Sequence, residues 1–230
     1  MQTQQTQLPE AGARKKAVFL VDDHPLVREW LTNLIHRQGD LTVCGEADTA
    51  AGAKQAIPAL KPDIAIVDIG LKDSSGIELI KDLKRLSPGL AVLVLSMHEE
   101  AHYVERALRA GARGYIMKRE TTRKVIAAIR QVLQGKLYVS EEMAEAMAAQ
   151  FVEGKTLESR SAAEQLSDRE LEVFELLGQG RGTRQIAETL RVSVKTVQAY
   201  CARIKEKLNL ASATELIREA VRWHESKDER

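Results

Sequence analysis

The first part of the chain alternates short apolar runs with longer amphipathic stretches. The apolar runs are predicted to be strands and lie at residues 17–22, 41–46, 63–68, 91–96 and 114–118. The stretches between them carry apolar residues at helical spacing, which predicts helices at about 25–37, 49–60, 75–86, 99–110 and 121–134. Strands that are apolar on both faces and alternate with helices favour a parallel sheet covered on both sides. The pattern therefore predicts a doubly wound α/β domain with a five-stranded parallel sheet over residues 17–136.

The pattern changes after this segment, where no further strand-like run occurs. Residues 137–165 combine a helical stretch with a polar segment of small residues, which is typical of a partly helical linker. Residues 166–230 predict four short helices, and "SDRE" (167–170) and "SATE" (212–215) each have the form of a capping box. The polar, Gln-rich residues 1–16 predict a disordered tail. A small all-α domain is therefore expected to follow the α/β domain.

Composition and charge are those of an ordinary globular protein. The chain has 230 residues, enough for two domains, with 44% hydrophobic and 29% charged residues. Its net charge of +1 identifies no partner. Cys44 and Cys201 are too far apart for a metal-ligand motif and fit a reducing compartment. The first apolar run is too short for a signal peptide or a membrane span, so we expect a cytoplasmic protein without a membrane partner.

Polar side chains end four of the five predicted strands. Asp22 and Asp23 close the first strand, Asp68 closes the third, Ser96 the fourth and Lys118 the fifth. In a parallel sheet these strand ends lie along one edge, where open α/β sheets place their ligand sites. Three carboxylates, a hydroxyl and an ammonium group are therefore expected to share one pocket.

Electrostatics limits what such a pocket can do. Two carboxylates 4 Å apart repel by about 4 kcal/mol at an effective dielectric constant of roughly 20, so a cation or a proton has to relieve the repulsion. Mg²⁺ prefers oxygen ligands of this kind, and a carboxylate can act as a nucleophile toward phosphorus. His24 lies beside the two aspartates and could have a catalytic or metal-binding role. We interpret it instead as a residue of the first helical turn near solvent.

The motifs "VDDH", "VDIGLKDSSGIEL", "LSMHEE" and "GYIMK" match, in order and spacing, the receiver domain of two-component response regulators. Residues 17–136 therefore resemble this domain, which has a flavodoxin-like fold. The resemblance implies that Asp68 is the phosphoacceptor, and that Asp23, Asp68 and the carbonyl of Gly70 bind Mg²⁺ directly, with Asp22 acting through water. It also implies that Ser96 and Lys118 contact the phosphoryl group, and that Tyr115 is an aromatic switch residue.

The second predicted domain carries a concentration of positive charge. Residues 181–207 contain seven Lys and Arg residues and two Glu residues, a local charge of +5 within a chain of net charge +1. Their order, a helix, a short turn and a second helix at 194–208, is that of a helix-turn-helix unit. The second helix is predicted to have an apolar face, formed by Val194, Val197, Cys201, Ile204 and Leu208, and a polar face that also carries small residues. Such a face can approach base edges closely.

The segments "LSDRELEVFELLGQG", "QIAETLRVSVKTVQAY" and "IKEKLNL" are similar to the LuxR-type helix-turn-helix domain of NarL/FixJ regulators. The resemblance implies contacts to DNA phosphates from Lys195, Thr196, Arg203 and Lys207. Gln198, Ala199 and Ala202 would face the bases, where Gln pairs with adenine and Ala meets thymine methyl groups. In this family the last helix, here at about 213–224, pairs two copies of the domain, which implies a dimer contact through Leu216, Ile217 and Ala220.

Together the two resemblances predict a transcription regulator that binds promoter DNA as a homodimer and receives its phosphoryl group from a sensor histidine kinase. We expect no enzymatic turnover beyond phosphorylation of the protein itself and loss of that phosphate. One alternative is a regulator that acts through protein contacts, without DNA or without phosphorylation. Another is a phosphatase with an aspartyl nucleophile. Enzymes of the haloacid dehalogenase type carry a D-x-D motif on the first strand, whereas the first-strand aspartates here are adjacent.

Overall fold

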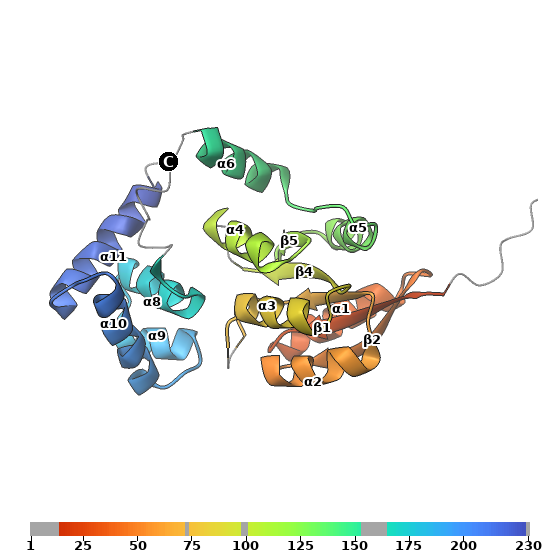
Figure 1. The fold of residues 1–230 in the computed structure, drawn as a ribbon, viewed down its shortest axis with the longest axis horizontal. Coiled ribbons are helices and arrows are strands. Elements are labelled where there is room, and N and C mark those ends of the chain that lie inside the picture. The colour runs from red at the N-terminus through yellow and green to blue at the C-terminus, as the bar shows by residue number, and fades with distance from the viewer. Residues whose placement is uncertain (1–13, 72–73, 98–100, 153–164, 229–230) are drawn as a thin grey trace, which may run out of the picture.

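The computed structural model describes residues 14–71, 74–97, 101–152 and 165–228 (Figure 1). Most of the predicted tail and residues 153–164 of the predicted linker lie outside these ranges. The tail prediction extended too far at its end, because Lys16 already belongs to the first strand. Its ammonium group lies 2.9 Å from the carboxylate of Asp63, which ties the start of that strand to the neighbouring one.

The sheet is five-stranded and entirely parallel, as predicted. Its order is β2-β1-β3-β4-β5, so the chain runs first to one side of β1 and then to the other. The strands are β1 (Lys16–Val21), β2 (Leu41–Ala47), β3 (Ile64–Val67), β4 (Ala91–Ser96) and β5 (Gly114–Met117). All residues of β3 and β5 are buried, which explains why these runs are apolar on both faces.

Helices cover both faces of this sheet. They are α1 (Pro25–His36), α2 (Ala50–Leu60), α3 (Gly76–Leu86), α4 (Ala101–Ala110) and α5 (Thr122–Leu133). Val18 and Leu20 of β1 belong to the buried cluster that includes residues of α1 and α5. Phe19 and Val21 alternate with them and belong to the opposite cluster, with residues of α2, α3 and α4. The period of two along the strand therefore separates the two layers.

The rest of the described chain is helical, with α6 (Glu141–Val152), α8 (Asp168–Gly178), α9 (Thr183–Thr189), α10 (Val194–Lys207) and α11 (Ala213–Asp228). We call residues 165–228 the helix-turn-helix module. The first predicted capping box forms, because the backbone amide of Ser167 donates to Glu170 at 2.8 Å. The second is shifted: Glu215 accepts from the amide of Ala211 rather than from that of the cap residue. None of the described helices combines the length and the hydropathy that a membrane crossing needs.

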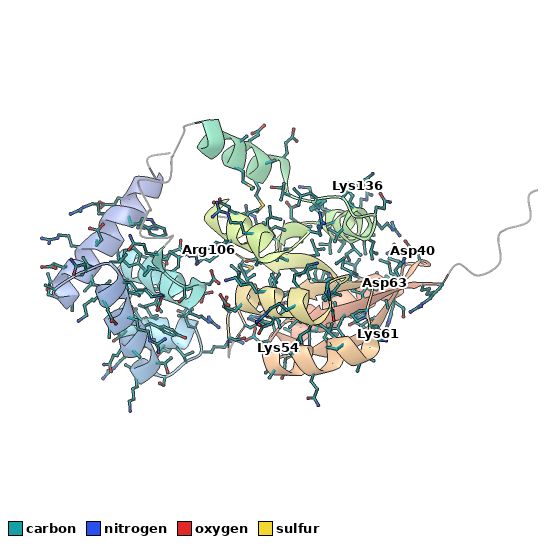
Figure 2. All side chains as sticks on the ribbon, in the orientation of Figure 1. Asp40, Lys54, Lys61, Asp63, Arg106 and Lys136 are labelled. Atoms are coloured by element: carbon teal, nitrogen blue, oxygen red, sulfur yellow. The ribbon has the colours of Figure 1, made fainter. Side chains whose placement is uncertain are left out.

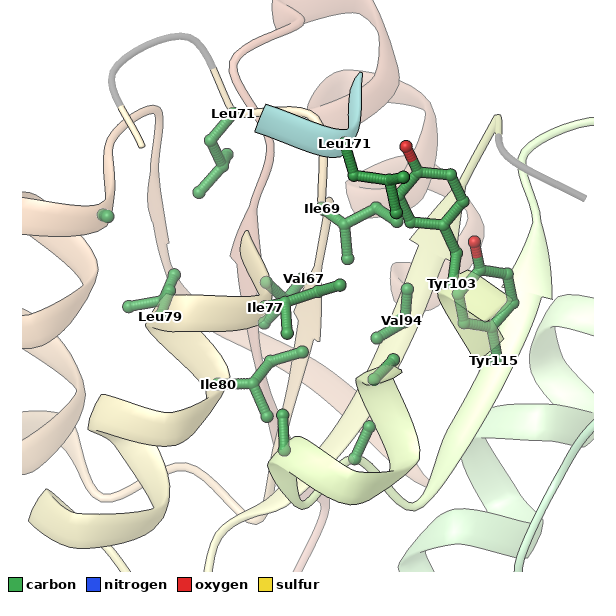
Figure 3. Close-up of a cluster of buried hydrophobic side chains, with 14 of the residues drawn as sticks. Val67, Ile69, Leu71, Ile77, Leu79, Ile80, Val94, Tyr103, Tyr115 and Leu171 are labelled. Atoms are coloured by element: carbon green, nitrogen blue, oxygen red, sulfur yellow. The ribbon is translucent and has the colours of Figure 1, made fainter. Parts of the chain in front are cut away.

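Helix α8 joins the helix-turn-helix module to the sheet domain. Its Leu171 packs beside Ile69, at the exit of β3, and beside Tyr103 of α4 (Figure 3). Arg106 of α4 lies on the side of the α/β domain that faces α8 and forms an ion pair with Asp168 (Figure 2). The two domains therefore share one hydrophobic cluster and a polar contact beside it.

Candidate functional site

The predicted strand-end residues meet in one place, which we call the acidic pocket: Asp22, Asp23, Asp68 and Lys118. The ammonium nitrogen of Lys118 lies 2.8 Å from Oδ2 of Asp68 and 2.8 Å from Oδ2 of Asp22. The amide of Gly70 donates to Oδ1 of Asp68 at 3.0 Å. One lysine thus bridges carboxylates from two neighbouring strands, and the Gly70 amide supports the second oxygen of Asp68.

Backbone hydrogen bonds fix the strand ends that carry these side chains. The amide of Asp68 donates to the carbonyl of Val21 at 2.8 Å, and that of Lys118 donates to Ser96 at 2.7 Å. Gly76, the first residue of α3, lies against the backbone of Asp68. A Cβ atom on Gly76 would lie 2.2 Å from the carbonyl oxygen of Asp68, so only glycine permits this close approach. The sheet edge and the tight start of α3 together place Asp68.

Burial and charge shift the ionisation of the pocket. Burial is the largest influence on Asp68 and raises its pKa; Asp22 raises it further, while Lys118 opposes the shift. The pKa of Asp68 is therefore above its ordinary value. For Lys118, burial alone would lower the pKa, but the carboxylates of Asp68 and Asp22 outweigh burial and raise it. Lys118 is thus charged. Ionisation of Asp68 costs free energy, because its carboxylate is buried.

The residues present fit a hard divalent cation. Oδ2 of Asp22 and Oδ1 of Asp23 are buried and accept no well-aligned hydrogen bond from the described residues, although Lys118 Nζ lies 2.8 Å from the first and His24 Nδ1 lies 2.9 Å from the second. Buried acceptors of this kind are costly unless a cation serves them. Carboxylate oxygens on Asp22, Asp23 and Asp68 lie close enough to share one ion. This oxygen-rich set is typical of a site for a divalent cation such as Mg²⁺.

His24, interpreted above as a residue of the first helical turn near solvent, also lies beside the carboxylates of the acidic pocket. Its Nδ1 lies 3.0 Å from Asp22 and 2.9 Å from Asp23, while its side chain is still 42% exposed. His24 is the cap residue of α1, and the tight turn before the helix directs its ring back over the two carboxylates. The "DDH" order did point to this proximity, but it could not establish the direction of the ring.

The helix-turn-helix module closes the outer side of the acidic pocket. The pocket encloses about 330 Å³, and residues of α8 and of the turn before α10 line it together with Asp23, Asp68 and Lys118. Nη1 of Arg191 lies 2.8 Å from Oδ2 of Asp23. Arg169 donates to the carbonyl of Ser74 at 3.0 Å, at the rim of the same edge. Sequence reasoning missed these residues, because no local pattern links positions so far apart in the chain.

The predicted switch residues lie next to this interface. Ser96 ends β4 and is buried, and Tyr115 of β5 is buried as well. Tyr115 lies beside Tyr103 in the cluster that also holds Leu171 (Figure 3). Tyr103 donates from its hydroxyl to Glu175 of α8 at 3.1 Å. Tyr103 therefore lies between Tyr115 and α8, and a change in the position of the Tyr115 side chain would affect α8 through Tyr103.

The predicted DNA-contacting residues lie on α10. Its side chains at Lys195, Gln198, Ala199, Ala202 and Arg203 are exposed, and Thr196 is half-buried. The predicted apolar face holds for Val197 and Ile204, which are buried, but not for Val194, which is exposed at the first turn. Lys207 is exposed and its ammonium group lies 2.6 Å from Glu170 of α8, so it has a partner within the module.

Two of the three residues of the predicted dimer contact are buried within the module. Leu216 and Ala220 are 2% and 0% exposed, because α11 packs its apolar stripe against α8. A Cβ atom on Gly178 of α8 would lie 2.5 Å from the carbonyl oxygen of Ala220, which shows how close the two helices are. Ile217 is 48% exposed and points away from this contact. A helical stripe in sequence does not distinguish a core face from a partner face.

A parallel sheet with this acidic pocket, joined to a helix-turn-helix module, defines the class of two-component response regulators. The family model of the response regulator receiver domain matches residues 18–130, and that of the bacterial regulatory proteins of the luxR family matches residues 164–220. The chain belongs to the family of response regulators that combine these two domains. It is a phosphorylation-regulated transcription regulator, not a classical enzyme.

Each reported relative is matched over nearly its whole length. Oxygen regulatory protein NreC of Staphylococcus carnosus is 33% identical over 209 residues, which cover 89% of this chain and 96% of NreC. A LuxR-family response regulator from Aurantimonas sp. SI85-9A1 is 31% identical with a TM-score of 0.58, covering 60% of this chain and 99% of that chain. RcsB of Salmonella enterica serovar Typhimurium, solved with promoter rprA and the phosphomimetic BeF₃⁻, has a TM-score of 0.58 at 24% identity. That match covers 90% of this chain and 99% of RcsB, and it supports the fold.

Proposed function

We propose that Asp68 is the phosphoacceptor and that a sensor histidine kinase is the donor. An oxygen of the Asp68 carboxylate attacks the phosphorus of the phosphohistidine, the phosphorus–nitrogen bond breaks, and the histidine nitrogen leaves with the bonding electrons. The product is an acyl phosphate on Asp68. The main support for the proposal is the contact between the ammonium nitrogen of Lys118 and Oδ2 of Asp68 at 2.8 Å. It places a buried positive charge beside the position that the phosphoryl oxygens would occupy.

A divalent cation, Mg²⁺ by preference, completes the proposed site. Asp23, Asp68 and the carbonyl of Gly70 would hold it directly, and Asp22 would hold it through water. When bound, the ion neutralises carboxylate charge and polarises the phosphoryl group. Ser96 would donate a hydrogen bond to the transferred group, and Tyr115 would respond to the change at the pocket. Phosphorylation modifies the protein itself and is not a turnover reaction.

The output would be binding of promoter DNA in the cytoplasm. We propose that Lys195, Thr196, Arg203 and Lys207 contact phosphates, while Gln198, Ala199 and Ala202 face the bases. The exposure of most of this face of α10 supports the assignment. A homodimer would place two such helices on paired half-sites. The solved complex of two RcsB dimers with two parallel DNAs is consistent with such an arrangement.

The experiment combines labelling with DNA binding in the full chain. The wild type, Asp68→Asn and the control Asp82→Asn, whose half-buried carboxylate pairs with Lys54 outside the acidic pocket, are incubated with acetyl phosphate and Mg²⁺. Labelling is expected in the wild type and the control and absent in Asp68→Asn, and promoter binding is expected to increase only in the labelled proteins. Full labelling of Asp68→Asn would overturn the phosphoacceptor assignment. Labelling without any change in DNA binding would favour a regulator that acts through protein contacts.

A further inference from the structure

Arg191 brings a cation from the helix-turn-helix module into the acidic pocket. Its guanidinium Nη1 lies 2.8 Å from Oδ2 of Asp23, and Asp23 is only 4% exposed at its side chain while Arg191 is 47% exposed. The arginine therefore reaches in from the solvent side and ends on a buried carboxylate. An ion pair with one buried and one exposed partner is less screened than a surface pair.

The turn between α9 and α10 fixes the direction of this side chain. Arg191 has a φ of +51°, in the left-handed region that arginine rarely adopts. The amide of Val192 donates to Ala187 at 2.9 Å and that of Arg191 donates to Glu188 at 3.2 Å. The end of α9 thus holds Arg191 at a defined position, two residues before Ser193, the cap of α10.

Further contacts of the docked module are made to receiver residues other than the carboxylates of the acidic pocket. Asp168 pairs with Arg106 and accepts from the hydroxyl of Ser75 at 3.3 Å. Tyr103 donates to Glu175. These groups do not compete with a cation for Asp23. Among the described contacts, the one from Arg191 is therefore the contact of the module that reaches a proposed metal ligand.

We propose that Arg191 and a divalent cation compete for Asp23, so that metal binding and docking of the helix-turn-helix module oppose each other. This inference rests on the proposed role of Asp23 as a metal ligand. A guanidinium and a divalent ion bound to one carboxylate repel each other. Each of them also weakens the attraction of the carboxylate for the other. Because coupling between two binding events is reciprocal, docking weakens metal binding by the factor by which metal binding weakens docking.

The coupling gives the protein a definite order of events. A receiver site that is to accept phosphate must first bind its cation, and binding that cation loosens the module at Arg191. Arg191 is three residues before Val194, the first residue of α10. The N-terminal part of a recognition helix is the part that contacts base edges. Release at Arg191 therefore frees the end of α10 that DNA binding uses.

The test compares binding of Mn²⁺, which takes the same oxygen ligands as Mg²⁺ and whose free ion is counted by electron paramagnetic resonance. The full chain is measured as wild type, Arg191→Gln, Arg191→Lys and Arg184→Gln. Arg184 is an exposed residue of α9 outside the pocket, so its substitution removes the same charge without touching Asp23. We expect Arg191→Gln to bind Mn²⁺ at least about fivefold more tightly than the wild type, a typical coupling factor. Arg184→Gln and Arg191→Lys are expected to stay near the wild-type value.

A second readout follows docking directly. Hydrogen exchange of the α8 amides is expected to become faster when Mn²⁺ is added to the wild type, and to be already fast in Arg191→Gln without metal. Equal Mn²⁺ affinity in Arg191→Gln and the wild type, or weaker binding in Arg191→Gln, would overturn the competition while the metal site itself stands. If Asp23→Asn binds Mn²⁺ as well as the wild type, the proposed metal site fails instead, so the two failures are distinguishable.

Discussion

The hydroxyl of Tyr103 on α4 donates a 3.1 Å hydrogen bond to the buried carboxylate of Glu175 on α8. This bond links the receiver domain to the helix-turn-helix module at a point where both partners are almost fully buried. Tyr103 also lies beside Tyr115, the predicted switch residue (Figure 3). This pair of side chains therefore connects the receiver to α8, in addition to the other contacts of the module.

Tyr103→Phe is expected to loosen the docked module. The substitution removes the donor and leaves the Glu175 carboxylate with less compensation, at a cost of about 1–3 kcal/mol. Hydrogen exchange of the α8 amides should become several-fold faster in the full chain. Tyr138→Phe is the matched control, since Tyr138 pairs with the sheet through its backbone and lies apart from α8. Equal exchange in Tyr103→Phe and the wild type would show that the bond does not hold the domains together.

Asp68→Asn is expected to stabilise the metal-free protein by roughly 1–2 kcal/mol near neutral pH, within the usual range for one substitution. Burial raises the pKa of Asp68 in the folded state, so folding favours the protonated carboxyl group. The contribution of Asp68 to stability is therefore full below its unfolded pKa and is lost as the pH rises through the folded pKa. Urea unfolding in EDTA should show the difference from the wild type growing between acidic and neutral pH.

Saturating Mg²⁺ is expected to reduce or reverse that difference, because the ion stabilises the ionised wild-type pocket and has one ligand fewer in the variant. The control Asp82→Asn, outside the acidic pocket, should show no such response to Mg²⁺. A wild type that is more stable than Asp68→Asn in EDTA at every pH would contradict the electrostatic description of the pocket.

The predicted phosphate contacts give a prediction on salt dependence. Lys195→Gln and Arg203→Gln are each expected to weaken binding to all DNA sequences alike, and to reduce the slope of log affinity against log salt by about 1. Fluorescence anisotropy over a range of salt concentrations measures both quantities. Lys136→Gln, on the receiver domain at a distance from α10 (Figure 2), is the control and should leave the slope unchanged. Unchanged slopes in the α10 variants would exclude this face from DNA contact.

Leu216 and Ile217 are neighbours on α11 with different burial, so substituting each of them with lysine is expected to have a different effect. Ile217→Lys places charge on the exposed side of the helix and is expected to weaken pairing on DNA while the fold remains stable. Leu216→Lys buries an unpaired charge against α8 and is expected to lower the free energy of unfolding by at least about 3 kcal/mol. Thermal unfolding and sedimentation with a two-half-site DNA distinguish the effects. Full pairing by Ile217→Lys would place the dimer contact on another surface.

Much of the fold and the inner part of the site could be predicted from the sequence. Strands that are apolar on both faces and polar residues at the strand ends are local signals, and parallel strands necessarily bring Asp22, Asp68 and Lys118 to one edge. The contact of Arg191 with Asp23 could not be predicted, because it depends on how two domains dock over a separation of 168 residues. The burial of Leu216 and Ala220 within the module could not be predicted for a related reason. An apolar stripe says that a face is covered, but not whether α8 or a second chain covers it.

Locating the phosphoryl group in the chain tests directly whether Asp68 is the phosphoacceptor. The wild-type chain is phosphorylated by acetyl phosphate with Mg²⁺ and reduced with borohydride, which converts an aspartyl phosphate to homoserine, and the peptides are sequenced by mass spectrometry. The acidic pocket built on Lys118 and Asp68 predicts homoserine at position 68, lost when EDTA replaces Mg²⁺. Homoserine at position 22 or 23 with an unmodified Asp68 would contradict it.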